Sequence, residues 1–199
     1  GHLARAGHAL TVLDQDRAAA GRVARDTGAR VADTPAQVAA ASEVVITMLP
    51  NGQVVQQVVC GPDGVAQGVR AGALLLDTSS AEPWLTEQTA AALAARGAGM
   101  VDAPVSGAAW GAADATLVFM VGGAAADVER VRPLLQLMGR SIHHLGALGC
   151  GHAMKCLNNC ITAMTFAATS EALVAGKRYG LDPQAMVEVL NESTGGSWI

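Results

Sequence analysis

Short apolar runs alternate with longer amphipathic segments over most of the chain. The apolar runs predict β-strands at residues 9–14, 43–49, 73–77, 100–104, 117–123 and 141–145. The segments between them predict helices at residues 16–28, 83–96 and 126–138. Because the strands are apolar throughout, we expect both faces of a mostly parallel sheet to be covered by helices. The pattern predicts an α/β fold with a doubly wound sheet.

The pattern changes after Leu145. Residues 150–179 contain no proline and are followed by Gly180, which predicts one long helix, and Asp182-Pro183 predicts the start of another. We therefore expect residues 1–146 to form the α/β domain and residues 147–199 to begin an all-helical domain. Within the first domain, Thr78 or Ser80 is expected to cap the helix that starts near Pro83.

The composition narrows the class of protein. The 199 residues are 51% hydrophobic but 3% aromatic, which predicts a core of Ala, Val and Leu. The net charge of -4, without a cluster of Lys and Arg, argues against nucleic-acid binding. No run reaches the roughly 18 apolar residues of a membrane span, and the first residues lack a signal-peptide pattern. Four cysteines are no disulfide framework in a chain of this length, so the cytoplasm is the expected location.

Asp14 ends the first predicted strand. An acidic residue at this place in a doubly wound fold binds the adenosine ribose hydroxyls and repels the 2′-phosphate of NADP. An Asp just before a helix is also an ordinary helix cap, and position alone favours that second interpretation. A G-x-G-x-x-G turn about 20 residues earlier would support the first. The chain contains no such turn, so either it is truncated or the protein lacks this loop.

Small and polar residues follow three predicted strands, in LPNG (49–52), DTSS (77–80) and DAPVSG (102–107). Each alone is an ordinary turn, but together they outline one edge of a binding crevice, because ligands bind beyond the carboxyl ends of such strands. The hydroxyl of Ser106 and the backbone N–H groups of Gly107 and Ala108 suit a substrate carboxylate.

Lys155 lies in an apolar setting within GCGHAMKCLNN (149–159) and shares a helix face with Asn159. Burial of an ammonium lowers its pKa, which suits proton transfer near neutral pH. The competing interpretation is a side chain whose stem is buried while its ammonium reaches water.

The order and spacing of these segments resemble the β-hydroxyacid dehydrogenase family. The resemblance rests on LARAGH (3–8), MLP (48–50), DTSS, DAPVSG followed by ATLVFMVGG (115–123), and GCGHAMKCLNN. It implies a Rossmann-type NAD-binding domain followed by a helical domain. It also implies hydride transfer between NAD, with NADP less favoured, and a short β-hydroxy acid such as 3-hydroxyisobutyrate.

The resemblance implies roles for individual residues. Lys155 matches the family's general acid/base, and Asn159 matches the asparagine that orients it. Ser106 and Gly107 match the segment that binds the substrate carboxylate. The expected cofactor-binding residues are Asp14, Leu49, Pro50 and Ser80. Family members pair through their helical domains, so a homo-oligomer is expected.

The chain also departs from the family pattern. The family often has Gly at the positions of Ala108 and Ala115, and Trp110 is bulky for its segment. We expect a chain truncated at both ends, without the first strand and the glycine-rich loop, which binds NAD poorly as an isolated polypeptide. The alternatives are an imine reductase, in which the lysine is generally replaced, and a non-catalytic binding or assembly module.

Four possible metal ligands lie close together in the sequence: Cys150, His152, Cys156 and Cys160. They contain no C-x-x-C spacing and lie mostly on one predicted helix, which favours small buried thiols over a zinc site. No metal is expected.

Overall fold

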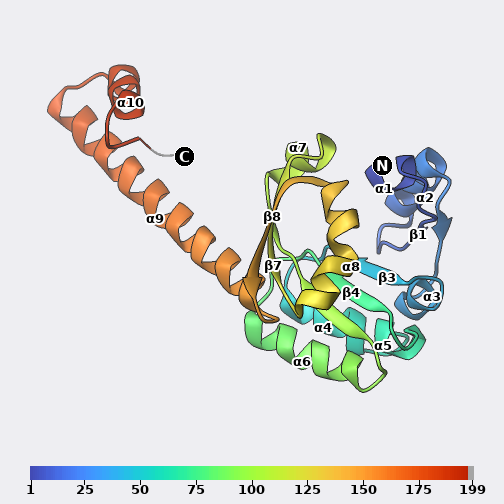
Figure 1. Cartoon of the computed structure of the whole chain (residues 1–199). Coiled ribbons are helices and arrows are strands. Elements are labelled where there is room, and N and C mark those ends of the chain that lie inside the picture. Colours follow the sequence, from blue (N-terminus) through green and yellow to red (C-terminus); the bar gives the residue numbers. More distant parts are fainter. Residues whose placement is uncertain (197–199) are drawn as a thin grey trace. The chain divides into compact units, whose positions relative to one another are not determined.

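The computed structural model describes residues 1–196 and divides into two compact units, residues 1–155 and residues from 156 onward (Figure 1). The first unit is an α/β structure and the second is helical, which confirms the predicted fold class. The domain boundary after residue 146 stays a prediction. Helix α9 (Cys150–Tyr179) begins in the first unit and continues into the second.

A six-stranded sheet lies at the centre of the first unit, in the order β3-β4-β5-β7-β6 with β8 paired to β7. Its strands are β3 (Val44–Thr47), β4 (Leu74–Asp77), β5 (Gly99–Asp102), β6 (Val105–Ser106), β7 (Leu117–Gly122) and β8 (Gly139–Gly146). β3, β4 and β5 are parallel, as are β7 and β8, but β7 is antiparallel to β5 and β6. The chain reverses direction between β6 and β7 because the segment that joins them, which holds α7 (Ala108–Ala113), is short. Parallel strands need a longer crossover connection.

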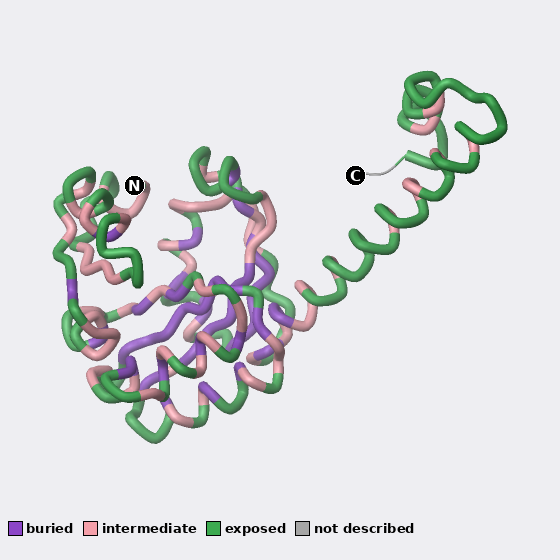
Figure 2. Tube along the Cα trace, turned by 180° about the vertical axis from the view of Figure 1, so that it is seen from behind, coloured by how far each residue is buried: buried purple, intermediate pink, exposed green. Residues whose placement is uncertain are grey.

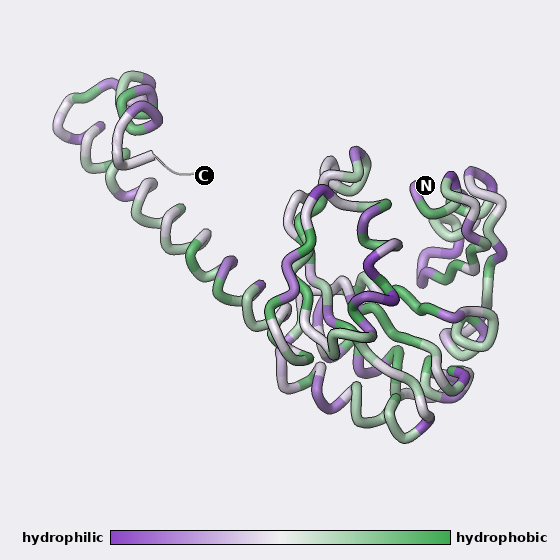
Figure 3. The backbone as a smooth tube through the Cα atoms, in the orientation of Figure 1, coloured by the Kyte–Doolittle hydropathy of each residue, from purple (hydrophilic) through white to green (hydrophobic). Residues whose placement is uncertain are grey.

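Helices cover both faces of the sheet, as predicted. Leu74 and Leu76 of β4 pack on one face with Val128, Val131 and other residues of α8 (Ala125–Gln136). Leu75 packs on the other face with residues of α3 (Pro35–Ala40), α4 (Gly52–Cys60), α5 (Val65–Gly68) and α6 (Pro83–Ala94). Figure 2 shows burial concentrated along the central strands, and Figure 3 shows that β4 is apolar. Each fully buried leucine stabilises the fold by about 1.5–3 kcal/mol.

A separate two-stranded parallel sheet holds β1 (Thr11–Val12) and β2 (Arg30–Val31), joined by α2 (Arg17–Thr27). The prediction of a buried strand over residues 9–14 was wrong in length and burial. Within residues 1–196, β1 pairs only with β2, so its two residues are half-buried. β2 was not predicted, because two exposed residues make no apolar run. A short helix, α1 (His2–Arg5), precedes β1.

The helices α3, α4, α5 and α7 of this unit were not predicted. In α4 the valines at positions 54, 55, 58 and 59 favour a strand locally. Tertiary packing decides otherwise, because Val55 and Val59 are buried against the sheet. Asn51, predicted to lie in a turn, caps this helix by accepting a hydrogen bond from Val54 N (2.9 Å).

The predicted cap of α6 was also wrong. Its N-cap is Glu82, which makes no side-chain capping bond, and Pro83 occupies the first helical position. Thr78 instead donates from its hydroxyl to the carbonyl oxygen of Thr47 (2.6 Å), which joins the end of β4 to that of β3.

The second unit consists of the rest of α9 and of α10 (Pro183–Glu192). Helix α9 ends at Tyr179, and Gly180 has a φ of 103°, which glycine adopts without strain. Asp182 caps α10 by accepting from Ala185 N (3.1 Å). Both features agree with the sequence prediction. In the part of the chain that the structure describes, no helix is long and apolar enough to cross a membrane.

Candidate active site

The parallel strands β3, β4 and β5 end side by side. Thr47 pairs with Asp77, and Asp77 pairs with Asp102, so the last residues of the three strands are neighbours. The segments LPNG, DTSS and DAPVSG therefore begin at one edge of the sheet, as the sequence predicted. Ligands of doubly wound sheets bind at this edge.

Two of the predicted cofactor-binding segments are joined directly. Leu49 N donates a hydrogen bond to the Ser79 hydroxyl (2.9 Å), which holds the loop after β3 against the loop after β4. Pro50 and Ser80 are exposed on these loops, and Leu49 is half-buried. These three residues are therefore near one another and accessible to a ligand.

Asp14 lies just beyond the end of β1, which is a strand of the separate two-stranded sheet. Its carboxylate is exposed and accepts a hydrogen bond from Asp16 N (2.8 Å). Asp16, and not Asp14, caps α2, by accepting from Ala18 N (2.8 Å) and Ala19 N (3.1 Å). The interpretation of Asp14 as a helix cap was therefore wrong, and its exposed carboxylate is compatible with ribose binding.

The predicted substrate-binding residues lie at the turn between β6 and α7. Ser106 ends β6 and pairs in register with Val118 of β7. Gly107 has a φ of 128°, and Ala108 begins the short helix α7. An added Cβ at Gly107 would lie 3.3 Å from Leu117 Cδ2, so this turn is closely packed.

Lys155 lies in the second turn of α9 and is half-buried. Desolvation by burial lowers the pKa of its ammonium from the ordinary lysine value. Asn159 follows one turn later on the same helix, is exposed, and accepts a long contact from Asn158 Nδ2 (3.4 Å). The predicted direction of the pKa shift is thus confirmed, whereas the catalytic roles of both residues stay predictions.

A buried aspartate holds the first turn of α9. Asp102, at the end of β5, accepts hydrogen bonds from the backbone N–H groups of Gly149 (2.8 Å) and His152 (2.7 Å). These groups have no intrahelical partner, so Asp102 caps α9 from another element. At Gly151 an added Cβ would overlap the Met120 carbonyl oxygen, which shows how closely this turn packs on β7.

The imidazole of His152 lies between Asp102 and a second aspartate, Asp77, and all three residues are fully buried. Carboxylate oxygens of Asp77 and Asp102 lie 3.8 Å from Nε2 and 3.7 Å from Nδ1, respectively. Nε2 is 3.1 Å from the carbonyl oxygen of Ser79, and Nδ1 is 2.7 Å from the Thr86 hydroxyl oxygen. A carbonyl oxygen only accepts, so Nε2 carries a hydrogen and donates it to Ser79.

Asp77 completes the network. Its Oδ1 accepts from the Thr47 hydroxyl (2.9 Å) and from Ser79 N (3.1 Å). Among residues 1–196 its Oδ2 has no hydrogen-bond partner. The network therefore links the ends of β3, β4 and β5 to α6 and α9.

Sequence reasoning missed the buried cluster of Asp77, Asp102 and His152. DTSS and DAPVSG were singled out for their small residues, and His152 was considered only as a metal ligand. The sequence feature that could have indicated this cluster is the aspartate at the end of each of two adjacent apolar strands. A carboxylate at such a place is buried and needs several hydrogen bonds.

Two protein-family models match the chain. Residues 1–146 match the NAD-binding domain of 6-phosphogluconate dehydrogenase, and residues 149–199 match the NAD-binding domain of NADP-dependent 3-hydroxyisobutyrate dehydrogenase. The chain is 43% identical to a 3-hydroxyisobutyrate dehydrogenase of Pseudomonas aeruginosa over 198 residues, which are 99% of this chain and 66% of the relative. It is 39% identical to an NAD-dependent L-serine dehydrogenase of the same organism, with the same shares covered.

The solved structures agree. A structure of Mycobacterium tuberculosis 3-hydroxyisobutyrate dehydrogenase with L-serine superposes with a TM-score of 0.89 at 36% identity, over 99% of this chain and 66% of that one. The chain belongs to the β-hydroxyacid dehydrogenase family. It spans slightly less than two thirds of the length of these relatives.

Two departures from the β-hydroxyacid dehydrogenase pattern have a structural consequence. Ala108 and Ala115, where the family often has glycine, have φ angles of 54° and 55°. Left-handed backbone disfavours a residue with a Cβ by about 1–2 kcal/mol. Ala108 is the first residue of α7 and Ala115 follows this helix, so the segment after Ser106 is held in a strained conformation.

The cluster of cysteines and His152 forms no metal site in the described chain: residues 1–196 contain no group of three possible ligands. The expectation of buried thiols was wrong for Cys156 and Cys160, which are exposed, and Cys150 is half-buried. The reason is that only Gly151 and His152 of α9 are buried, so the helix surface beyond them is largely uncovered.

The strain at Ala115 predicts a gain in stability. Ala115→Gly is expected to raise the free energy of unfolding by about 0.5–1 kcal/mol, because relief of left-handed strain exceeds the entropy that glycine loses on folding. Urea unfolding measures the change. In Ala91→Gly, the matched control on the exposed side of α6, the free energy should fall by about 1 kcal/mol. A lower stability of Ala115→Gly would contradict the assignment of strain.

Proposed function

We propose that the protein transfers a hydride between NAD and a short β-hydroxy acid, with Lys155 as general acid/base. The observation that carries the proposal is a half-buried lysine with a lowered pKa, one turn after the buried network that joins α9 to the three strand ends. The P. aeruginosa and M. tuberculosis relatives, named 3-hydroxyisobutyrate dehydrogenases, support this choice of reaction.

The chemistry requires a group that changes protonation near the reacting oxygen. NAD, when bound, supplies the hydride acceptor for oxidation, and its reduced form supplies the donor for reduction. Lys155 accepts the proton of the substrate hydroxyl during oxidation and returns a proton to the carbonyl oxygen during reduction. A lowered pKa makes the neutral amine available closer to physiological pH than in an ordinary lysine. Asn159 would orient the lysine and the substrate.

The strand ends fit a dinucleotide. Asp14 presents an exposed carboxylate for the ribose hydroxyls, and Leu49, Pro50 and Ser80 lie on the two joined loops. In residues 1–196 the buried Oε2 of Glu82 has no hydrogen-bond partner, and it lies beside the first residue of α4, where an added Cβ on Gly52 would be 2.5 Å away. A ligand donor at this edge would satisfy that oxygen.

We infer a preference for NAD over NADP. The Asp14 carboxylate would repel a 2′-phosphate. The nearest arginine in sequence, Arg17, donates to the carbonyl oxygen of Ala32 (2.9 Å) and pairs with Asp33 (3.3 Å), so its guanidinium already has partners. The L-serine dehydrogenase relative is NAD-dependent, which agrees.

We place the substrate carboxylate at Ser106, Gly107 and Ala108. The close packing at Gly107 and the strained Ala108 hold these backbone N–H groups in one arrangement. The side chain of Trp110 on α7 is 73% exposed, so it is available to contact the rest of the substrate. A substrate panel of 3-hydroxyisobutyrate, glycerate, 3-hydroxypropionate and serine covers short β-hydroxy acids of different side chain.

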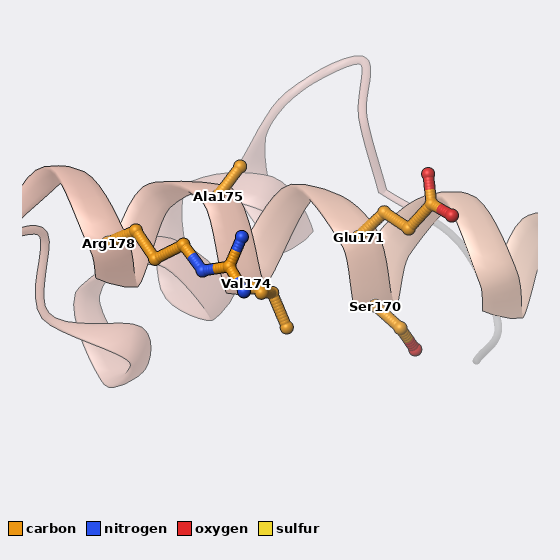
Figure 4. A pocket seen from close by; sticks show the side chains of 5 residues that line it. All are labelled: Ser170, Glu171, Val174, Ala175 and Arg178. Carbon is orange, nitrogen blue, oxygen red and sulfur yellow. The ribbon is translucent and has the colours of Figure 1, made fainter.

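We infer that α9 and α10 are covered by a second copy of the chain. Large apolar side chains of α9, among them Leu157, Ile161, Met164 and Phe166, are exposed. A shallow hollow along α9 is lined by Ser170, Glu171, Val174, Ala175 and Arg178 (Figure 4). An apolar face of this extent is typical of an interface.

We also infer a reducing compartment such as the cytoplasm for this protein, because its four cysteines are all free thiols.

Loss of the general acid/base should abolish most turnover. In the protein at its natural full length, Lys155→Ala is expected to lower kcat/KM for oxidation by about 10²–10⁴-fold. Formation of NADH with the substrate panel measures this. Lys177→Ala, which removes the other lysine of the chain at an exposed position, should leave the rate unchanged. Wild-type turnover in Lys155→Ala would refute the proposal, and so would the absence of turnover of any hydroxy acid by the wild type. A wild type that binds NAD without turnover would indicate a binding module.

The pH dependence has a defined sign. Oxidation needs the neutral amine, so kcat/KM for oxidation should rise with pH and level off below the usual lysine pKa of about 10.4. Reduction needs the ammonium and should fall over the same interval. A plateau reached only at the ordinary lysine pKa would contradict the proposed effect of burial.

Removal of the Asp14 charge should relax the cofactor preference. Asp14→Asn is expected to raise the ratio of kcat/KM for NADP to that for NAD by about tenfold, since roughly 1.4 kcal/mol of repulsion corresponds to that factor. Asp26→Asn removes an equal charge from the exposed side of α2 and should leave the ratio unchanged. An unaltered ratio in Asp14→Asn would show that this carboxylate does not face the ribose.

A charge on the apolar face of α9 should weaken self-association. Val174, 52% exposed within the hollow, is the position to change. Val174→Glu is expected to shift the sedimentation equilibrium toward monomer, because a charged side chain would replace an apolar one at the interface and would have to lose its hydration there. Ala91→Glu adds the same charge to α6 of the first unit and should have no effect. A wild-type protein that stays monomeric at all concentrations would exclude the inferred oligomer.

A further inference from the structure

The contact between α9 and the rest of the first unit is concentrated in one helical turn. Gly151 and His152 are the buried residues of α9, and the exposed surface begins at Cys156. Lys155 lies in between, three residues after His152. The direction in which α9 presents Lys155 is therefore determined largely at this turn.

Hydrogen bonds to the backbone at the start of α9 restrain the rotation of the helix about its axis less than a side-chain contact does. Asp102 binds two N–H groups and fixes where α9 starts. A side chain that reaches another element also fixes the rotation of the helix about its axis. His152 is such a side chain, since it contacts Ser79 after β4 and Thr86 in α6.

The size of a rotational error shows why this matters. Side-chain atoms about 6 Å from a helix axis move by about 1 Å when the helix rotates by roughly 10°. A displacement of about 1 Å at a reacting group can slow catalysis by about 10²-fold. A small loss of restraint at His152 is therefore enough to affect proton transfer by Lys155.

The surroundings of His152 make this restraint strong. Thr86 Oγ1 lies 2.7 Å from His152 Nδ1 and 3.2 Å from the carbonyl oxygen of Glu82, so the hydroxyl that contacts the ring is itself held within α6. The two buried carboxylates flank the ring at 3.8 Å and 3.7 Å, so His152 is enclosed on both sides by buried polar groups. Any rotation of the ring would leave buried polar atoms unpaired.

We propose that His152 is a positioning residue for Lys155: its contacts with Ser79 and Thr86 fix the rotation of α9 and so the position of the Lys155 amine at the strand ends. This inference rests on the proposed function, because it assigns His152 a role through the general acid/base. It also links the lysine to the loop that carries Ser80, a proposed cofactor contact. The same buried residues would then hold both the cofactor-binding loop and the general acid/base in position.

Thr86 offers a mild test with a matched control. Thr86→Val removes the partner of His152 Nδ1 and also the hydroxyl bond to Glu82 O. Thr89→Val removes only the equivalent bond to Leu85 O (2.8 Å), from a threonine equally buried on the same helix. We expect the single-turnover rate of hydride transfer in Thr86→Val to fall by about 10-fold or more, while KM for NAD and the rate of Thr89→Val stay near wild type.

His152 itself provides the second test. His152→Leu should lower the single-turnover rate by about 10²-fold, and His152→Gln, which retains a long side-chain donor, should recover part of it. Circular dichroism and thermal unfolding establish whether each variant is folded. If His152→Leu does not fold, the comparison of Thr86→Val with Thr89→Val decides.

The failures of the two proposals are distinguishable. An active wild type with an inactive Lys155→Ala supports the proposed function whatever the His152 variants do. Equal rates for Thr86→Val and Thr89→Val would overturn the positioning role. So would a KM for NAD that rises as much as the rate falls, or a folded His152→Leu variant with the wild-type rate.

Discussion

Two carboxylates buried at the ends of adjacent strands are the constraint on which the first unit depends. Asp77 and Asp102 are fully buried, and a buried charge is tolerated only when it is hydrogen-bonded or paired. Their hydrogen-bond partners are Thr47 in β3, Ser79 after β4, and Gly149 and His152 at the start of α9. The imidazole of His152 extends the network to Thr86 of α6. Satisfying these two groups brings together loops that lie far apart in the sequence.

The same constraint brings the loops after β3, β4 and β5 together at one edge of the sheet. Loops after parallel strands diverge unless something joins them, and here the joints are hydrogen bonds from Leu49 N to Ser79 and from Thr78 to Thr47 O. The helix that carries Lys155 starts against the same edge. The proposed cofactor-binding loops and the proposed general acid/base would therefore share one support, which agrees with membership of the β-hydroxyacid dehydrogenase family.

Strain and order are distributed unevenly around this edge. The buried network is extensively hydrogen-bonded, whereas the segment between β6 and β7 contains Ala108 and Ala115 in left-handed backbone that glycine would adopt more readily. A turn of this kind keeps its shape only because the packing of Gly107 and Leu117 imposes it. The proposed carboxylate-binding N–H groups are thus held by their surroundings and not by local preference.

The sequence by itself determined the succession of apolar strands along the chain, the long helix that ends before Gly180 and the segments that begin at one edge of the sheet. Hydrophobic periodicity and glycine or proline positions are local properties, so they can be read along the chain. Only the tertiary structure decided that Asp16 caps α2 in place of Asp14, that the valines of α4 are helical, and that His152 lies between Asp77 and Asp102. These outcomes depend on which distant groups compete for the same burial and hydrogen bonds, and that competition has no signature in the local pattern.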